Sequence, residues 1–595
     1  MGSASVTQAA HRTRKRLAIF PAGVLSNGDY VSVVTAAGTG GSYWRGDALT
    51  RWRPDRTADT DGVLFWLRER DRGVMRTLTR FPFGGEAERE QVSWRPGGFT
   101  FERVVDDLET QIEIAVAPDH PLELRRVRLK NLLEKPRALE LAATMDIVLQ
   151  RAEADASHPA FSKLFVETAW DAGRGALVAG RRPRDRDQRH PCLAAALHGP
   201  GALEFETDRA LLWGRGNFSA APELLQRGTA LPGTTGNVLD PLFCLRRRFD
   251  LEPGGSVSFT LALAAGESWQ GALEALATAR TASAVDSFFA AAEAHEFGLL
   301  DRFGLDEKTA GGAQSSWVAQ QFGVPGLPRG AGLPDWKSIR RFGAQPGEPF
   351  VFFHAKKSGS ARVAEELLRR HEYLRAKGLP SKLILVYETI ARSPWIEKAA
   401  ETMGAWVGTA DAAGVAALEA AAAFVARDEA LDIDGWRDDP EWETPRAARV
   451  AAPELVPPAD EVLAEFNGYG GFSAEGDEYV VRFEREPSGA LRLPPQPWVN
   501  VIAREGFGFL ASETGSLSTW SQNSREHRLT PWSNDPVLDP HGEAFYVRDE
   551  ESGAFWSATP GPAPGPGRYE TRHGIGYSRY RYTGRDIEHE LRLFL

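Results

Sequence analysis

The chain has 595 residues and a net charge of −11, and hydrophobic and charged residues make up 42% and 25% of it. This length predicts several domains, and the composition is that of a globular protein. The acidic balance excludes nucleic-acid binding through a broad basic surface, because such binding depends on neutralising phosphates.

Two features bear on the compartment in which the chain works. Cys192 and Cys244 are the only cysteines, too few for a disulfide framework, so a reducing compartment is the default. No apolar run approaches the roughly 18 residues that a membrane span requires. The N-terminus also lacks the apolar core of a secretory signal. We therefore expect no membrane span and a cytoplasmic location.

Residues 18–265 predict a first domain built of β-strands. Alternating or β-rich sequence marks segments that begin at Tyr30, Gly62, Thr110, Leu122, Ala138, Phe161, Cys244 and Ser256. Turn sequences such as Asn27-Gly28 separate them. Together with 17 Trp, 59 Gly and 38 Pro, this pattern favours a mainly β protein with antiparallel sheets.

The pattern changes after the first domain. Residues 266–345 predict a helical and irregular linker, since Ala-rich segments with helical spacing precede a stretch rich in Gly and Pro. Residues 346–430 predict a small α/β insert, in which continuous apolar strands such as EPFVFFHA alternate with helices. Its turn Lys356–Ser360 is either a surface turn or an anion site at a helix N-terminus. Residues 431–465 predict a second linker.

An internal repeat is the most specific signal in the chain. At an offset of 480, the matched pairs are Trp52 and Trp532, Asp55 and Asp535, Gly62 and Gly542, Phe65 and Phe545, Arg68 and Arg548, and Gly73 and Gly553. Farther on, DLETQIEIAV meets DIEHELRLFL at an offset of 479. Residues 466–595 therefore predict a second, partial copy of the first domain. Its strands are expected to leave a sheet edge and an apolar face uncovered unless the first copy or another molecule covers them.

Several long motifs resemble glycoside hydrolase family 94. The second copy contains NGYGGFSAEGDEYVV, PWVNVIAREGFGFLASETGS and TWSQNSREHRLTPWSNDPV, and the first contains AAGTGGSYWRGDALTRW, EFETDRALLWGRG and VLDPLFCLRRR. These motifs are similar to the N-terminal carbohydrate-binding sandwich domains of that family. The resemblance is greatest to the tandem sandwich region that precedes the catalytic barrel in cyclic β-1,2-glucan synthases, and it covers nearly the whole chain.

The resemblance implies a mainly β fold with two β-supersandwich copies, the second one partial, joined by helices and the small α/β insert. In the family these sandwiches pack on a helical barrel that carries the general acid and the phosphate site. No position of this sequence matches those residues, so we assign no catalytic residue, cofactor or metal. The implied partner is a β-glucan or oligosaccharide, β-1,2-linked, with a separate catalytic-barrel chain as a further partner.

A long polar loop next to a Trp is the candidate carbohydrate-binding site. Sugars are held by planar polar side chains and by stacking on aromatic rings, and this loop supplies both. The candidate residues are Asn523, Arg525, Glu526, Arg528, Trp532, Asn534 and Asp535. The alternative is that these side chains form a buried polar network that holds the loop in place.

Other polar clusters indicate less. Glu204, Glu206 and Asp208 alternate along one strand, which is typical of a solvated face, although paired carboxylates also carry out glycoside hydrolysis. His190 with Cys192, and His589 with its neighbouring glutamates, lack the spacing of a zinc site.

Three functions therefore remain open. The chain is a carbohydrate-binding or scaffolding protein, or part of a family 94 phosphorylase or glucan synthase whose barrel lies on further sequence or a separate chain, or a truncated product without independent activity.

Overall fold

The computed structural model describes eleven stretches of the chain. They are residues 22–54, 61–216, 221–279, 281–322, 335–357, 360–388, 401–402, 404–427, 461–486, 489–584 and 587–595. They form two compact units. Unit 1 lies within residues 22–152, 165–207 and 230–427, and unit 2 within residues 153–164, 208–229 and 461–595. The second linker expected at 431–465 lies almost entirely outside the described residues.

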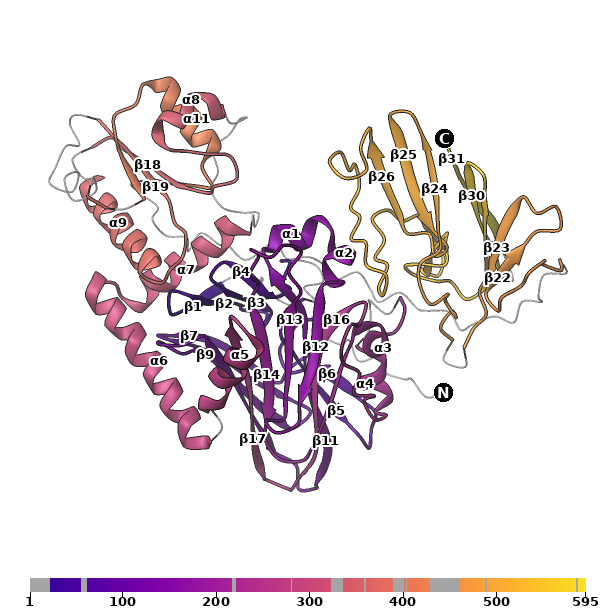
Figure 1. Cartoon of the computed structure of the whole chain (residues 1–595), viewed down its shortest axis with the longest axis horizontal. Coiled ribbons are helices and arrows are strands. Elements are labelled where there is room, and N and C mark those ends of the chain that lie inside the picture. Colours follow the sequence, from indigo (N-terminus) through magenta and orange to yellow (C-terminus); the bar gives the residue numbers. More distant parts are fainter. Residues whose placement is uncertain are drawn as a thin grey trace, which may run out of the picture. The chain divides into compact units, whose positions relative to one another are not determined.

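Two large antiparallel sheets form the sandwich of unit 1 (Figure 1). The nine-stranded sheet contains β1 (Ala22–Ser26), β2 (Tyr30–Thr35), β3 (Gly40–Trp44), β4 (Asp47–Thr50), β5 (Leu64–Glu69), β6 (Met75–Thr77), β11 (Arg137–Gln150), β15 (Ala202–Asp208) and β16 (Pro241–Leu251). The eight-stranded sheet contains β7 (Arg89–Arg95), β8 (Gly98–Val105), β9 (Leu108–Val116), β10 (Leu122–Asn131), β12 (Val166–Asp171), β13 (Ala176–Arg181), β14 (Cys192–His198) and β17 (Ser256–Gly266).

The main core of unit 1 lies between these sheets. Apolar residues from both inner faces, such as Phe65, Ile112, Leu141 and Leu261, are almost fully buried in one cluster. Alternation along each strand places every second side chain in this core, which is why the sequence pattern predicted the strands.

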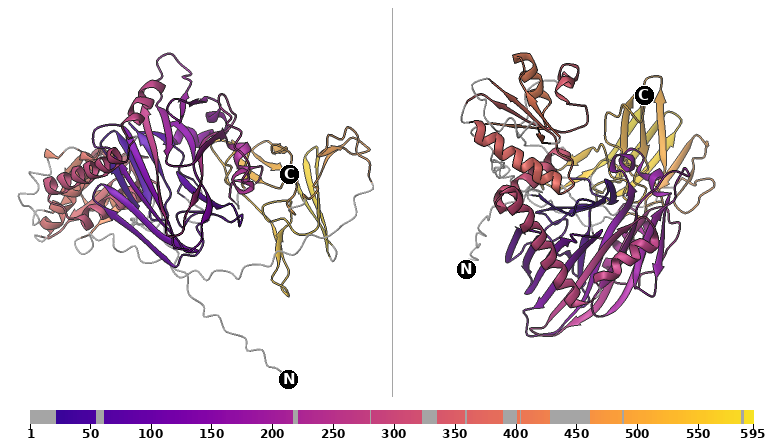
Figure 2. Two further views of the ribbon diagram at one scale, coloured as in Figure 1. Left: turned by 90° about the horizontal axis from the view of Figure 1, so that it is seen from below. Right: turned by 60° about the vertical axis from the view of Figure 1, so that its left-hand side comes forward.

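Helices α5 (Trp269–Leu276) and α6 (Ala282–Phe303) cover part of the outer face of the eight-stranded sheet (Figures 1 and 2). Alanines on that face, such as Ala194 and Ala264, let the helices approach closely and bury residues such as Leu273 and Phe288. Helix α7 (Glu307–Gln321) follows in a region for which Gly and Pro predicted irregular chain. Its N-terminus is capped by Asp306, and Trp317 and Val318 are buried.

The small α/β insert is confirmed. Its sheet is parallel, with the strand order β20 (Ala405–Gly408), β19 (Leu383–Tyr387), β18 (Val351–Ala355), β21 (Phe424–Ala426). Helices α9 (Ser360–Ala376), α11 (Ala412–Ala421) and α8 (Trp336–Ile339) accompany it. The helix expected near residues 395–403 lies outside the described residues apart from a short piece.

Unit 2 contains three sheets and four short helices. One sheet has the order β24 (Val499–Arg504), β25 (Phe507–Ser512), β26 (Leu517–Ser521), and a second has the order β22 (Gly470–Phe472), β23 (Glu478–Arg482), β29 (Arg568–Gly574), β30 (Tyr577–Thr583), β31 (Glu588–Phe594). Strands β27 (Tyr546–Arg548) and β28 (Phe555–Ser557) pair with each other. The helices are α1 (Ala152–Ser157), α2 (Pro159–Lys163), α3 (Arg209–Trp213) and α4 (Glu223–Arg227). All four helices come from the range 18–265 that the sequence assigned to the first domain. The strand expected from Phe161 begins only at Val166, because residues 159–163 are helical.

Backbone contacts confirm the internal repeat. The hairpin β5–β6 pairs Trp66 with Thr77, and β27–β28 pairs Tyr546 with Ser557, each residue shifted by 480. Glycines at matched turns, Gly38 and Gly515, have φ of 91° and 88°. A Cβ on either would lie 2.3 Å from a matched threonine side chain, Thr79 or Thr559, so glycine is required at both turns. The repeat is therefore one of structure, with the same hydrogen-bonded turns in both copies.

Candidate functional site

The loop predicted to bind sugar is a hairpin extension that follows β26. Trp520 and Arg528 form a β-bridge that closes it, and residues 522–527 at its tip are exposed. The Asn523 side chain accepts hydrogen bonds from the backbone N–H groups of Arg525 and Glu526 (both 2.9 Å), so Asn523 shapes the turn. Arg525 and Glu526 pair with each other at 3.0 Å and stay exposed.

Trp532 and Arg528 form the accessible part of the predicted site. Trp532 is 37% exposed, and the Arg528 guanidinium lies 5.9 Å from the centre of its ring. An aromatic face beside a guanidinium combines a stacking surface with paired hydrogen-bond donors. This pair can therefore contact a sugar without any rearrangement of the core.

Asp535 has a structural role instead. Its carboxylate accepts hydrogen bonds from Arg209 of α3 at 3.0 Å and from the N–H groups of Val537 and Leu538. Burial alone would raise the pKa of Asp535, but the charges of Arg209 and Lys163 hold it well below its usual value. Asn534, at φ 47°, forms the bend that precedes it. The seven candidates thus divide into an exposed turn, an accessible Trp–Arg pair and a buried anchor.

A second buried cluster fixes the base of the loop. Arg215, just after α3, contacts Glu513 at 2.9 Å and Asp539 at 3.3 Å. Asp539 also accepts hydrogen bonds from the hydroxyls of Ser512 and Thr514, both at 2.9 Å. Two carboxylates thus share one guanidinium inside unit 2, and burial raises the pKa of Glu513 to about 7.

Sequence reasoning missed these anchoring residues. Arg209 and Arg215 lie in EFETDRALLWGRG and Glu513 lies in LASETGS, two of the motifs that carry the family resemblance. The motifs were the only available signal, because about 300 residues separate Arg215 from its partners. No local pattern reveals an ion pair over that separation.

Comparison of the two copies explains why Trp532 is accessible. Its counterpart Trp52 is 5% exposed and packs edge-on against Phe322, with ring centres 4.8 Å apart. Phe65 is 4% exposed in the core between the two sheets of unit 1, whereas its counterpart Phe545 is 50% exposed. Positions that are core in unit 1 therefore present aromatic side chains on the surface of unit 2.

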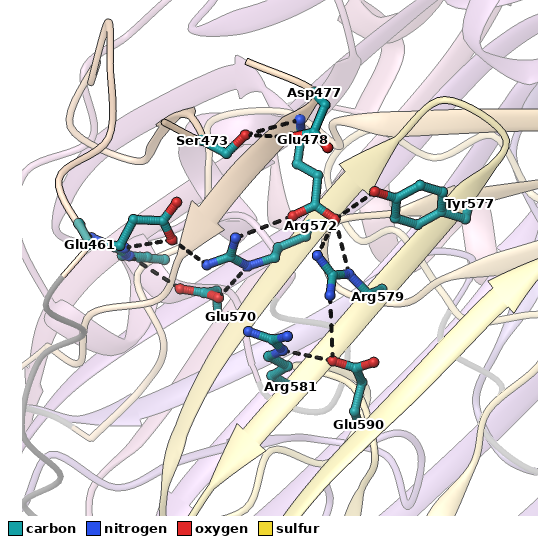
Figure 3. A network of polar contacts seen from close by, with 11 residues as sticks. Glu461, Ser473, Asp477, Glu478, Glu570, Arg572, Tyr577, Arg579, Arg581 and Glu590 are labelled. Atoms are coloured by element: carbon teal, nitrogen blue, oxygen red, sulfur yellow. Dashed lines mark hydrogen bonds and ion pairs between the residues drawn. The ribbon is translucent and has the colours of Figure 1, made fainter. Parts of the chain in front are cut away.

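Figure 3 shows a polar network on the outer face of the five-stranded sheet of unit 2. At its centre Arg572 binds three carboxylates, those of Glu570 (2.6 Å), Glu478 (3.2 Å) and Glu461 (2.5 Å). Glu478 also accepts hydrogen bonds from Tyr577 and Arg579. Burial would raise the pKa of Glu478, but these hydrogen bonds lower it. The polar groups of this network pair with one another and thereby link four strands, β23, β29, β30 and β31. We call this clamping of the sheet.

The other sequence candidates are structural. Glu206 is fully buried and accepts hydrogen bonds from the N–H groups of Thr207 and Thr234, so the expected solvated face is wrong. Glu204 pairs with Arg246, and Asp208 caps α3. Burial raises the pKa of Cys192 to about 11 and of Cys244 to about 12.

The described part of the chain contains neither a cluster of metal-binding side chains nor a helix that could span a membrane. No group of three or more His, Cys, Asp or Glu residues there is arranged to hold a metal ion. None of the helices described there is both long and apolar enough to cross a membrane.

Residues 8–282 and 477–595 match the family model of the glycosyl hydrolase 94 supersandwich domain. The chain belongs to this family. The first matched region contains β1–β17 and the second contains β23–β31, and the α/β insert lies between them. The family 94 resemblance and the mainly β fold expected from the sequence are therefore confirmed.

Two relatives are longer proteins, of which the chain covers a part. It is 29% identical to cyclic β-(1,2)-glucan synthase NdvB of Rhizobium meliloti (strain 1021) over 617 residues, which cover 95% of this chain and 21% of the synthase. It is 30% identical to N,N'-diacetylchitobiose phosphorylase of Vibrio furnissii over 121 residues, which cover 20% of this chain and 14% of the phosphorylase. The chain thus spans about a fifth or less of the length of these relatives.

Solved structures show only distant likeness. A bacterial glucoamylase complexed with acarbose has a TM-score of 0.34 at 10% identity, covering 54% of this chain and 43% of that one. The family GH92 inverting mannosidase of Bacteroides thetaiotaomicron has a TM-score of 0.30 at 11% identity, covering 52% of this chain and 37% of that one.

Proposed function

We propose that this chain is the carbohydrate-binding and scaffolding part of a family 94-type glycoside phosphorylase or cyclic β-1,2-glucan synthase, working in the cytoplasm. The observation that carries the proposal is the alignment with the Rhizobium meliloti synthase along 95% of the chain. The proposed ligand is a β-1,2-linked glucan or oligosaccharide. A catalytic barrel on further sequence or a separate chain is the proposed partner.

The proposed contact surface is the loop that contains Trp532. The ring of Trp532 stacks on the C–H face of a pyranose, and the Arg528 guanidinium donates paired hydrogen bonds to its hydroxyls. Asn523, Arg525 and Glu526 add polar groups at the tip, and Asn534 and Asp535 hold the base. The buried ion pair of Asp535 with Arg209 supports a preorganised loop, which limits the entropy lost on binding.

Calorimetric titration of the full chain with β-1,2-glucooligosaccharides tests this site. We expect binding heat above that of cello-oligosaccharides, and about a tenfold weaker affinity for Trp532→Ala, since an aromatic stacking contact contributes about 1 kcal/mol or more. Phe472→Ala is the matched control, because Phe472 is a similarly exposed aromatic (44%) on edge strand β22. Unchanged affinity in Trp532→Ala would show that the site is wrong. Absence of heat with the wild-type chain at millimolar sugar would contradict the binding role itself.

The likeness to chitobiose phosphorylases supports a second candidate, that the chain is a fragment of an active phosphorylase or glycosyltransferase. No residue of this chain matches the general acid or phosphate site that the family places on a barrel. We therefore expect the chain alone, incubated with β-1,2-glucan and inorganic phosphate, to release no glucose 1-phosphate. Release that persists through repurification would favour the enzyme. A chain that neither binds nor turns over glucan would favour the third reading, a truncated product without activity of its own.

A further inference from the structure

A polar groove lies on the outer face of the eight-stranded sheet of unit 1. It has a volume of about 390 Å³ and crosses the five adjacent strands β7, β8, β9, β10 and β17. The outward-facing side chains that line it are Arg89, Glu102, Glu109, Gln111, Arg128, Lys130, Ser256 and Ser258. This volume falls in the usual range of small-ligand sites.

The groove is the part of this face that the helices leave open. Towards one end of the strands the outer face carries small apolar residues such as Ala115 and Leu124, which α5 and α6 cover. Arg126 marks the boundary, because its guanidinium pairs with Asp286 of α6 and lies 4.5 Å from the ring of Phe289. Beyond it, the same face changes from apolar to polar and is uncovered.

The polar side chains form one cross-strand row. Ser258, Arg128, Gln111 and Glu102 lie directly opposite one another on successive strands. The Arg128 guanidinium donates to Gln111 at 2.8 Å, and the Gln111 amide donates to Glu102 at 2.8 Å. Planar groups held in a row in this way present alternating donors and acceptors that suit pairs of neighbouring hydroxyls.

Charge and position narrow the class of ligand. The cations Arg89, Arg128 and Lys130 are balanced by Glu102, Glu109 and the nearby Glu113, which pairs with Arg128 at 2.6 Å. This balance disfavours a polyanion. A peptide strand would need a free sheet edge, whereas the groove lies on the face of the sheet. A neutral, polyhydroxylated ligand is the class that matches the lining.

We propose that this groove is a second saccharide-binding site, which takes a neutral oligosaccharide through Gln111, Arg128 and Glu102. It rests on the proposed function, because that function supplies the ligand class. A chain with one site in each unit holds a glucan at two points.

The internal repeat supplies a matched control. Glu102 and Gln111 correspond, at the offset of 479, to Arg581 and Glu590 on the outer face of unit 2 (Figure 3). There Arg581 donates to Glu590 at 2.7 Å, so the same cross-strand pair is present with donor and acceptor exchanged. Unit 2 has no described counterpart of Arg128, because β31 pairs only with β30. Substitutions at Arg581 and Glu590 therefore change a similar polar pair outside the groove.

The test uses the full chain in a Trp532→Ala background, which weakens the loop site. β-1,2-Glucooligosaccharides and cello-oligosaccharides are titrated calorimetrically, and hydrogen exchange is followed over residues 108–131. We expect remaining saccharide binding with added protection of residues 108–131. The double variant Gln111→Leu, Arg128→Leu is expected to bind the saccharide about tenfold more weakly or worse, because hydrogen bonds are lost. Arg581→Leu with Glu590→Leu is expected to leave it unchanged.

Three outcomes separate the two sites. If the Gln111→Leu, Arg128→Leu chain binds with unchanged affinity and residues 108–131 gain no protection, the groove is not a saccharide site. The proposed function then stays intact if Trp532 is needed for binding. Binding of cello-oligosaccharide at the groove, without any binding of β-1,2-glucan, supports the groove and contradicts the proposed glucan specificity. Absence of binding for every saccharide overturns the groove. The double variant could unfold at a lower temperature than the control. In that case Gln111→Leu alone is the milder variant, and it must also weaken saccharide binding for the proposal to stand.

Discussion

Arg572→Leu is expected to destabilise unit 2 by about 3–5 kcal/mol, the cost of removing one partner from a buried ion pair. Arg572 is 9% exposed and its guanidinium lies among Glu461, Glu478 and Glu570. Leucine occupies a similar volume without the charge. Three carboxylates would then face one another with only Arg482 and Arg579 to neutralise them.

Thermal unfolding of the full chain measures this effect, with hydrogen exchange of β29–β31 to identify the transition of unit 2. The expected fall in Tm is roughly 10 °C for a unit of this size. Arg581→Leu is the matched control. Arg581 lies on the same sheet face, but its side chain is 43% exposed and its pair with Glu590 is exposed too, so the expected loss is below about 1 kcal/mol. Equal effects for the two variants would contradict a clamping role for the network.

Glu513 is expected to make unit 2 less stable as the pH rises from about 5 to 8. Burial raises the pKa of Glu513 to about 7, although the nearby Arg215 opposes this. The folded pKa lies above the unfolded value of about 4.3, so the carboxyl takes up a proton on folding. Its contribution to stability is therefore fully present below about pH 4 and is lost as the pH rises through about 7.

Glu513→Gln isolates this contribution. The difference in unfolding free energy between the wild type and the variant should fall by on the order of 2 kcal/mol from pH 5 to pH 8. Other titrating groups of unit 2, such as Asp535 and His573, act in both proteins and cancel in the difference. Denaturant unfolding of both chains across this pH range provides the measurement. A difference that is constant with pH would show that Glu513 is already ionised in the folded unit at pH 5.

Arg215→Met provides the reciprocal check on the same cluster. Without the guanidinium, the pKa of Glu513 should rise further, because the charge of Arg215 is the largest contribution that opposes burial. The pH at which stability falls should therefore move upward relative to the wild type.

The sequence by itself determined the fold class and the repeat. Alternation in segments such as Thr110–Val116, where Thr110, Ile112 and Ile114 are buried, depends on one buried face, so the strand and its inward side chains were readable locally. The repeat was equally readable, since Trp52 and Trp532, Phe65 and Phe545, and Gly73 and Gly553 recur at one offset along the chain. The family motifs also indicated the class of function, because each motif consists of particular residues in a fixed order along the chain.

Only the tertiary structure decided what each matched residue does. Trp52 and Trp532 occupy matched positions of the repeat. Trp52 is nevertheless buried against Phe322 at the end of α7, whereas Trp532 is accessible, because exposure depends on such distant elements. Asp535 binds Arg209, which is 326 residues away, and Glu206 is fully buried, and no local pattern indicates either fact. The groove row of Glu102, Gln111 and Arg128 likewise required the register of three strands, which no single stretch of sequence contains.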